Sequence, residues 1–154
     1  MASGLIVAAC ASDAHRRMYE GMPRPAHQRA TLQVAGKRPG LDNVFVIGTV
    51  DGKPTISPLE RAFYPYAGAN SVEVLPGRHT VFLSIRYEGR IAVGELWFDA
   101  EGGHAYAARV ASDGHPVRFR IEDEAAGSPV GGVLREFSEP APAGDGAGRG
   151  AASR

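Results

Sequence analysis

The chain has 154 residues, and 17 Lys plus Arg residues balance 17 Asp plus Glu residues, so the formal net charge is zero. This length is typical of a single domain, and 44% hydrophobic residues suffice for a core. A neutral chain without a basic cluster is not expected to bind nucleic acid, because a polyanion needs a strong positive surface. The single cysteine, Cys10, excludes a disulfide within the chain and a Cys-based zinc knuckle.

The stretch Val7-Ala8-Ala9-Cys10 resembles a bacterial lipobox, in which an aliphatic residue and two small residues precede a cysteine that becomes lipidated. The apolar segment before Cys10 is shorter than usual and follows no basic residue. We therefore expect residues 1–9 to be a short or truncated signal peptide and Cys10 to carry a lipid anchor. By the same resemblance, Ala11 in place of an aspartate implies the outer membrane. The alternative is an incidental cysteine on a protein that is soluble in the periplasm or in the cytoplasm.

Residues 10–29 are polar, and Pro23 and Pro25 predict an extended tether between the anchor and the domain. This stretch contains Tyr19-Glu20-Gly21-Met22-Pro23-Arg24-Pro25, which resembles the Tyr-Glu-Gly-x-x-Arg-Pro segment of a group of small Gram-negative lipoproteins of unknown function. Pro-Gly-Arg-His-Thr-Val at 76–81 and Gly-His-Ala-Tyr at 103–106 are similar to the same group. The resemblance implies a lipid-anchored β domain and brings no known activity.

Residues 30–137 carry the patterns of a β domain. Ala30 to Val34 alternates apolar and polar residues, and Asn43 to Val50 is apolar on both faces, as in an interior strand. Asp51-Gly52 favours a tight hairpin, and Pro54 confines the returning arm to a sheet edge.

The stretch from residue 71 to 110 is predicted to be an antiparallel meander, because apolar and polar residues alternate along it. A type II′ turn at Gly89-Arg90 would place Val81 opposite Phe98 and Leu83 opposite Leu96. Slipping by one residue would bury Glu95, so we expect the core to select this register.

The same register places Phe82 and Trp97 opposite each other on the other face of the sheet. If no second sheet covers that face, the two aromatic side chains form an exposed patch, which is a candidate interface for another protein. If that face is covered, they belong to the core. The pattern leaves both alternatives open.

Residues 58–70 are predicted to be a loop that carries Tyr64 and Tyr66, which either cap the open end of the core or touch a ligand. His79 and His104 are expected near the same end of the sheet, about 10 Å apart by strand spacing. With the two tyrosines they form a candidate rim site for a small ligand or metal. A histidine bonded to loop backbone is the alternative.

Val117, Phe119 and Ile121 predict another strand, and residues 130–137 predict the last one. Residues 138–154 are rich in Pro, Ala and Gly and are expected to be a disordered tail. No catalytic motif is present, and the sequence implies no cofactor.

The sequence therefore predicts an antiparallel β sandwich of seven or eight short strands, with a layout like that of an immunoglobulin domain as one option. The expected function is that of a non-catalytic, lipid-anchored protein of the cell envelope, which presents this domain to a partner protein. The alternative is a periplasmic module that binds a small ligand or metal at the sandwich rim.

Overall fold

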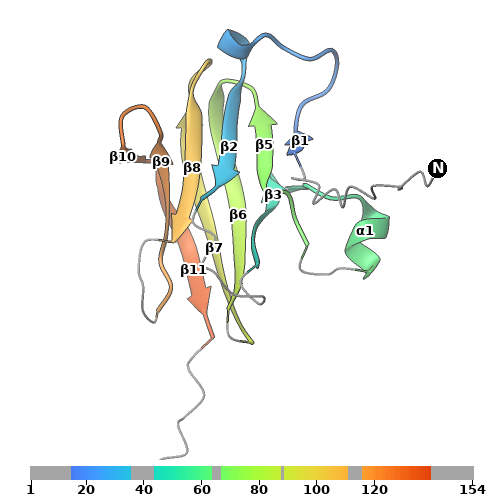
Figure 1. Cartoon of the computed structure of the whole chain (residues 1–154), viewed down its shortest axis with the longest axis vertical. Helices are drawn as coiled ribbons and strands as arrows, with labels where there is room; N and C mark the ends of the chain where they lie inside the picture. The colour runs from blue at the N-terminus through green and yellow to red at the C-terminus, as the bar shows by residue number, and fades with distance from the viewer. Residues whose placement is uncertain (1–14, 36–43, 64–66, 88, 111–115, 140–154) are drawn as a thin grey trace, which may run out of the picture.

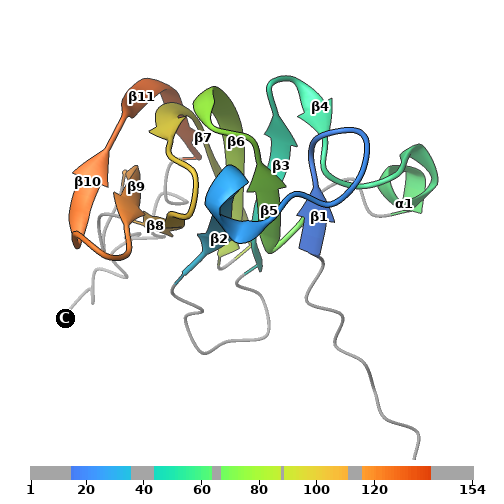
Figure 2. The same ribbon diagram turned by 90° about the horizontal axis from the view of Figure 1, so that it is seen from above.

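The computed structural model describes residues 15–35, 44–63, 67–87, 89–110 and 116–139, which form two sheets packed face to face (Figure 1, Figure 2). In spatial order, the six-stranded sheet contains β1 (His15–Arg17), β5 (Ser71–Val74), β2 (Ala30–Val34), β8 (Ala105–Val110), β9 (Phe119–Asp123) and β10 (Ser128–Val130). The five-stranded sheet contains β11 (Gly132–Ser138), β7 (Arg90–Ala100), β6 (Gly77–Tyr87), β3 (Val44–Val50) and β4 (Lys53–Pro54). The described helices are the 3-10 turn η1 (Ala26–Gln28) and α1 (Pro58–Phe63).

The predicted all-β sandwich is confirmed, and most strand pairs are antiparallel. Two pairs, β1 with β5 and β2 with β8, are parallel. The described residues form eleven strands rather than seven or eight. The strands that were not predicted, β1 and β10, have three residues each, which is too few to show an alternating pattern.

The core lies between the sheets and is made of alternate residues from both. On the five-stranded sheet, Val81, Leu83 and Phe98 are 0% exposed. The inner residues of the other sheet include Leu32, Val72, Tyr106 and Ile121. Each large apolar side chain fully buried in this way contributes about 1.5–3 kcal/mol. The inner face of β6 and β7 is thus the core face, and Phe82 and Trp97 lie on the outer face.

The predicted meander is wrong in its connections, because β5 and β8 belong to the six-stranded sheet and the β6–β7 hairpin belongs to the other. The chain crosses between the layers at Pro76 and Gly77, where Gly77 has a φ of 132°. It crosses back through Gly102 and Gly103. A Cβ on Gly102 would lie 2.3 Å from the carbonyl oxygen of His27, so a larger residue does not fit at this return.

The predicted register of the β6–β7 hairpin is wrong by two residues. Val81 pairs with Leu96, Leu83 pairs with Gly94, and Tyr87 pairs with Arg90. A shift of two residues leaves every side chain on the same face, so the hydrophobic pattern does not distinguish the two registers. The turn decides between them: because Tyr87 pairs with Arg90, Gly89, with a φ of 73°, is the last residue before the returning strand and not the first residue of a Gly89-Arg90 turn.

The expected tether is wrong from His15 onward. β1 pairs in register with β5 at the edge of the six-stranded sheet, and the Met18 N–H donates to the Glu73 carbonyl oxygen at 2.9 Å. The folded domain therefore includes residues 15–29. Residues 1–14 and the tail from residue 140 lie outside the described residues.

Residues 58–63 form the helix α1 within a segment that was predicted to be a loop. Ser57 and Glu60 form a capping box: the Glu60 N–H donates to the Ser57 Oγ at 3.2 Å, and the Ser57 N–H donates to the Glu60 Oε2 at 2.8 Å. Pro58 at the first helical position suits this start. Phe63 is 72% exposed and does not cap the core, while Tyr64 and Tyr66 lie outside the described residues.

Candidate functional site

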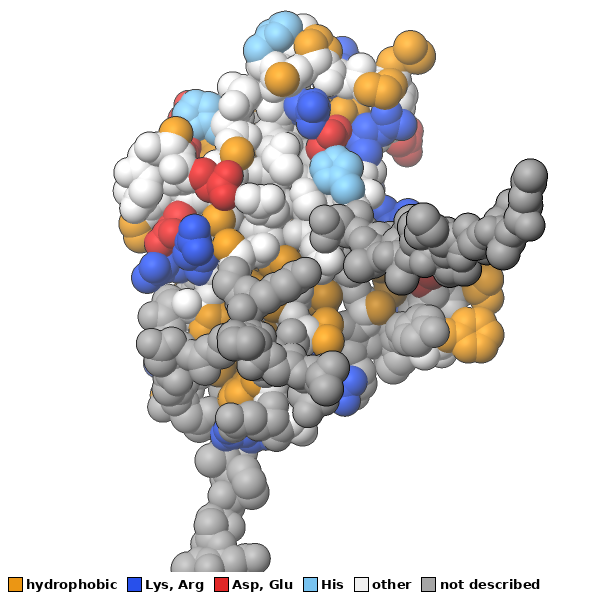
Figure 3. Space-filling model, viewed as in Figure 1, with side chains coloured by type: hydrophobic (Ala, Val, Ile, Leu, Met, Phe, Trp, Pro, Cys, Tyr) orange, Lys and Arg blue, Asp and Glu red, His pale blue; other side chains and the backbone are white. Residues whose placement is uncertain are grey.

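The outer faces of the two sheets differ in chemistry. The six-stranded sheet is polar outside: the Glu122 carboxylate bridges Arg109 and Arg120 at 2.6 Å each, and Gln33 donates to Glu124 at 2.8 Å. Figure 3 shows charged and histidine side chains at several places on the upper part of this face. The outer face of the five-stranded sheet carries a group of apolar residues, among them Val46, Phe82, Ile91 and Val93, and no sheet of the described residues covers it. Phe82 thus lies on the face of its sheet that no second sheet covers.

An open groove of about 460 Å³ lies across this outer face. Its apolar lining includes Val46, Phe82, Ile91 and Val93 from three neighbouring strands. The remaining lining residues come from β3, β4, the segment around α1, β6, β7 and β11: Gly48, Thr49, Pro54, Ile56, Arg61, Ala67, Ser84, Glu95 and Arg135.

A β-bulge shapes one side of the groove. The pairing of β3 with β6 shifts between Ile47 and Thr49, so Gly48 is the extra residue beside Phe82. A Cβ on Gly48 would lie 3.2 Å from the Phe82 ring. The glycine thus lets the ring lie against the strand.

The wall beside β3 is held by the buried hydroxyl of Thr55. This hydroxyl donates to the Ile47 carbonyl oxygen at 2.6 Å and accepts from the Ala69 N–H at 3.0 Å. Ile47 and Ala69 also exchange two backbone hydrogen bonds of 2.9 and 3.1 Å. Hydrogen bonds therefore join both ends of the segment that carries α1 to β3.

The ends of the groove are charged. Arg135 pairs with Glu95 at 2.5 Å on the β11 side. On the α1 side, the Arg61 side chain lines the groove and has no ion-pair partner among the described residues. The groove therefore combines an apolar floor with a cationic end.

The two aromatic residues of the predicted interface have different surroundings. Phe82 lines the groove, opposite Glu95 rather than opposite Trp97 as expected. Trp97 pairs with Thr80, and the Arg78 guanidinium lies 4.2 Å from its ring centroid. Phe82 is thus part of the groove, whereas Trp97 is shielded by Arg78.

His79 of the predicted rim site is engaged within the fold. Its Nδ1 lies 2.7 Å from Asp51 Oδ2, and its Nε2 lies 2.7 Å from the Leu75 carbonyl oxygen. The histidine thus joins the β3–β4 hairpin to the end of β5.

His104 is engaged at the end of the other sheet, where its Nδ1 lies 2.6 Å from Asp123 Oδ2. The hydrogen bond with Asp123 raises the pKa of His104, helped by the charges of Asp123 and Glu101 and opposed by partial burial. The hydrogen bond from His104, followed by the backbone N–H of Ala126, lowers the pKa of Asp123. Asp123 Oδ1 also accepts from the N–H groups of Ala125 and Ala126, so it orders the turn after β9.

The predicted rim site is not assembled by the described residues. The rings of Phe98 and Tyr106 lie between the two histidines, with centroid separations of 6.1, 5.1 and 6.1 Å from His79 to His104. The described residues contain no group of three or more His, Cys, Asp or Glu side chains that could hold a metal ion. Tyr64, Tyr66 and Cys10 lie outside the described residues.

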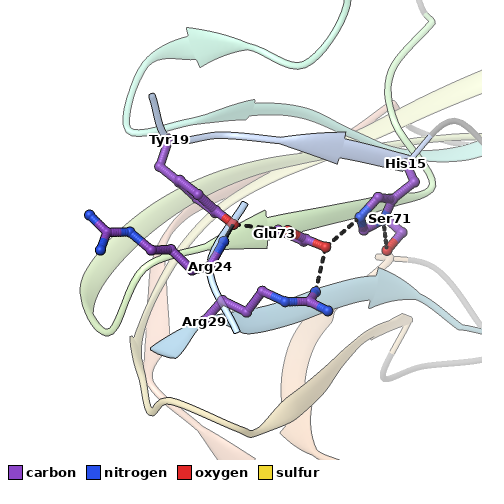
Figure 4. Close-up of polar contacts among 6 residues, drawn as sticks. All are labelled: His15, Tyr19, Arg24, Arg29, Ser71 and Glu73. Carbon is purple, nitrogen blue, oxygen red and sulfur yellow. Dashed lines mark hydrogen bonds and ion pairs between the residues drawn. The ribbon is translucent and has the colours of Figure 1, made fainter. Parts of the chain in front are cut away.

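Sequence reasoning missed Glu73, which lies at the centre of a polar cluster on the outer face of β5 (Figure 4). Its carboxylate lies 3.0 Å from His15 Nε2, accepts from the Tyr19 hydroxyl at 3.1 Å, and pairs with Arg29. Burial acts to raise the pKa of Glu73, but the hydrogen bonds from His15 and Tyr19 and the Arg29 charge outweigh it, so the pKa is lowered.

This cluster explains why the Tyr19–Pro25 motif belongs to the domain. Besides donating to Glu73, the Tyr19 hydroxyl accepts from the Arg24 N–H at 3.2 Å. The unusual composition of the motif was the signal in the sequence; its partner on β5 was visible only after folding.

No model of a known family, no characterised protein and no solved structure matches this chain. In the part of the chain that the structure describes, no helix has the length and apolar character to cross a membrane. The fold and the groove define a β sandwich with an apolar hollow on one outer face, and any function must be argued from these features.

Proposed function

We propose that the protein is a non-catalytic binding protein of the cell envelope, anchored by a lipid on Cys10, which holds an apolar part of another envelope protein in the groove. The observation that carries the proposal is the apolar groove on an uncovered sheet face, with Phe82 in its lining. A folded domain keeps such a hollow accessible at a cost in exposed apolar surface, and surfaces of this kind mark interaction sites.

The sequence supports the anchor through the lipobox resemblance at Val7–Cys10. Two or more acyl chains on one cysteine would hold the domain stably at a membrane, since each buried CH₂ contributes about 0.8 kcal/mol. Mass spectrometry of the mature N-terminus from the native host tests this part. We expect an acylated Cys10 as the first residue and a Cys10→Ser variant that leaves the membrane fraction. An unprocessed, unacylated chain would refute the anchor.

The groove is tested by photo-crosslinking in cells of the native host. A photoreactive phenylalanine analogue replaces Ile91, which lines the groove, or Thr31, on the outer face of the six-stranded sheet, as the matched control. We expect a light-dependent adduct with one defined protein from position 91 and none from position 31. The adduct should be lost when Val93→Glu places a charge in the groove. Equal labelling from both positions would refute the proposal.

A second candidate is the binding of a small apolar molecule, which the volume of the groove favours. Its 460 Å³ falls in the range of about 300–1,000 Å³ that is typical of small-molecule sites. This moves the ligand-binding hypothesis from the sandwich rim to the sheet face. Native mass spectrometry of the purified protein checks it: a co-purified small molecule that is lost in Phe82→Ala supports this candidate, and bare protein mass argues against it.

A further inference from the structure

The helix α1 exposes apolar side chains that are not buried in the domain. Leu59 and Phe63 are four residues apart, so they lie on one face of the helix, and they are 70% and 72% exposed. None of the six residues of α1 is buried. Figure 3 shows hydrophobic side chains at the outer edge of the molecule where α1 lies.

Polar contacts hold this helix in place. Besides the Ser57–Glu60 capping box, Arg16 of β1 donates to both carboxylate oxygens of Glu60, at 3.0 and 3.2 Å. The hydrogen bonds with Ser57, and then the Arg16 charge, lower the pKa of Glu60, so the carboxylate stays ionised at neutral pH. The contacts fix α1 beside β1 (Figure 2). The side chains of Leu59 and Phe63 remain exposed.

The start of β1 also sets how far this surface is from the anchor. Five residue steps separate Cys10 from His15. Because each step spans at most about 3.6 Å, a lipid on Cys10 would keep His15 within about 18 Å of the lipid attachment point. The surface around β1, which includes α1, would therefore face the membrane.

The charged residues near α1 do not share this apolar face. Arg16 is paired with Glu60, and Arg61, two residues from both Leu59 and Phe63, lies on the opposite side of the helix and lines the groove. Exposed apolar side chains on a surface held close to a bilayer are suited to enter the boundary between headgroups and acyl chains.

We infer that α1 is a membrane contact: Leu59 and Phe63 insert into the lipid surface to which Cys10 is anchored. The inference rests on the proposed anchor, and it adds an orientation to it. The sandwich would stand on the membrane through α1 and β1 rather than move freely on a tether.

The single cysteine allows a test that does not depend on processing in the host. The full chain is coupled through Cys10 to a maleimide lipid in vesicles of phosphatidylethanolamine and phosphatidylglycerol that carry brominated acyl chains. Phe63→Trp reports contact, because bromine quenches a tryptophan in the bilayer. The parent chain, with Trp97 alone, gives the background. Leu134→Trp is the matched control: Leu134 is 55% exposed on β11, at the opposite edge of the five-stranded sheet.

We expect at least twofold quenching at position 63 and none above background at position 134, with quenching at 63 reduced when Leu59→Ser is added. Leu59→Trp serves as a second reporter if Phe63→Trp alters the melting temperature. Equal quenching at positions 63 and 134, or none at 63 and 59, would overturn the membrane contact. An unacylated Cys10 in the host combined with quenching on vesicles would instead refute the anchor alone.

Discussion

The ring of Phe119 occupies the place that a side chain on Gly94 would take. A Cβ on Gly94 would lie 2.6 Å from Phe119 Cδ2. Gly94 pairs with Leu83 within the five-stranded sheet, whereas Phe119 belongs to the six-stranded sheet. Beside this contact, the Glu136 carboxylate accepts from the Phe119 N–H at 2.7 Å and so joins β11 to β9 across the open edge of the sandwich. The two sheets thus pack closely at this point because a glycine of one sheet faces an aromatic ring of the other.

Gly94→Ala should therefore destabilise the fold. Overpacking of a filled core costs about 1–3 kcal/mol, and we expect a loss of that size in the free energy of unfolding measured with urea. The double variant Gly94→Ala with Phe119→Leu tests the reason. Its loss should be smaller than the sum of the two single losses, because a smaller side chain relieves the clash. Simple additivity would contradict the proposed contact.

Thr55→Val should cost about 0.5–1.5 kcal/mol in the free energy of unfolding, although the two side chains have the same shape. The substitution removes the hydroxyl from the Ala69 N–H and from the Ile47 carbonyl oxygen, which keep only their own hydrogen bond of 3.1 Å. Thr31→Val, on a partly exposed outer face, is the control and should change stability by less than about 0.5 kcal/mol. Similar losses in both variants would show that Thr55 does not hold the groove wall.

Glu73→Gln should release the N-terminal segment from the six-stranded sheet. The substitution removes the charge that pairs with Arg29 and His15, which we expect to speed tryptic cleavage after Arg16 and Arg17 several-fold. Glu101→Gln, at a side chain that is 74% exposed, is the matched control. Unchanged cleavage would show that β1 is held by its backbone pairing alone.

The lowered pKa of Glu73 also predicts a pH dependence. A carboxyl group whose pKa is lower in the folded than in the unfolded state contributes its full stability above the unfolded value of 4.5. That contribution is lost as the pH falls through the lower folded value. The difference in melting temperature between the parent and Glu73→Gln should thus narrow below pH 4.5, and a constant difference would contradict it.

The His104–Asp123 pair should stabilise the fold in a window between two titrations. The pKa of His104 is raised above 6.5, so its contribution is complete below 6.5 and is lost as the pH rises through the folded value. The pKa of Asp123 is lowered below 3.8, so its contribution is complete above 3.8 and is lost in stronger acid. NMR titration of the His104 ring should give a pKa above the usual one in the parent and a lower one in Asp123→Asn. An unchanged value would exclude Asp123 as the cause.

The sequence alone determined the fold class, the edge position of Pro54, the Asp51-Gly52 hairpin and which residues of β6 and β7 share a face. These follow from local chemistry: a period of two selects one face, and turn residues select backbone angles. Asp51 and Gly52 indeed have φ values of 51° and 75°, as a two-residue hairpin with both angles positive requires.

Only the tertiary structure decided the rest. A register shift of two residues leaves every side chain on the same face of the sheet. The turn geometry, and not the pattern of apolar residues, therefore determines the pairing. The separation of His79 from His104, the groove around Phe82 and the Glu73 cluster each join residues far apart in the chain. Such contacts depend on which strands become neighbours, and that choice is made by packing two sheets together, which no local pattern encodes.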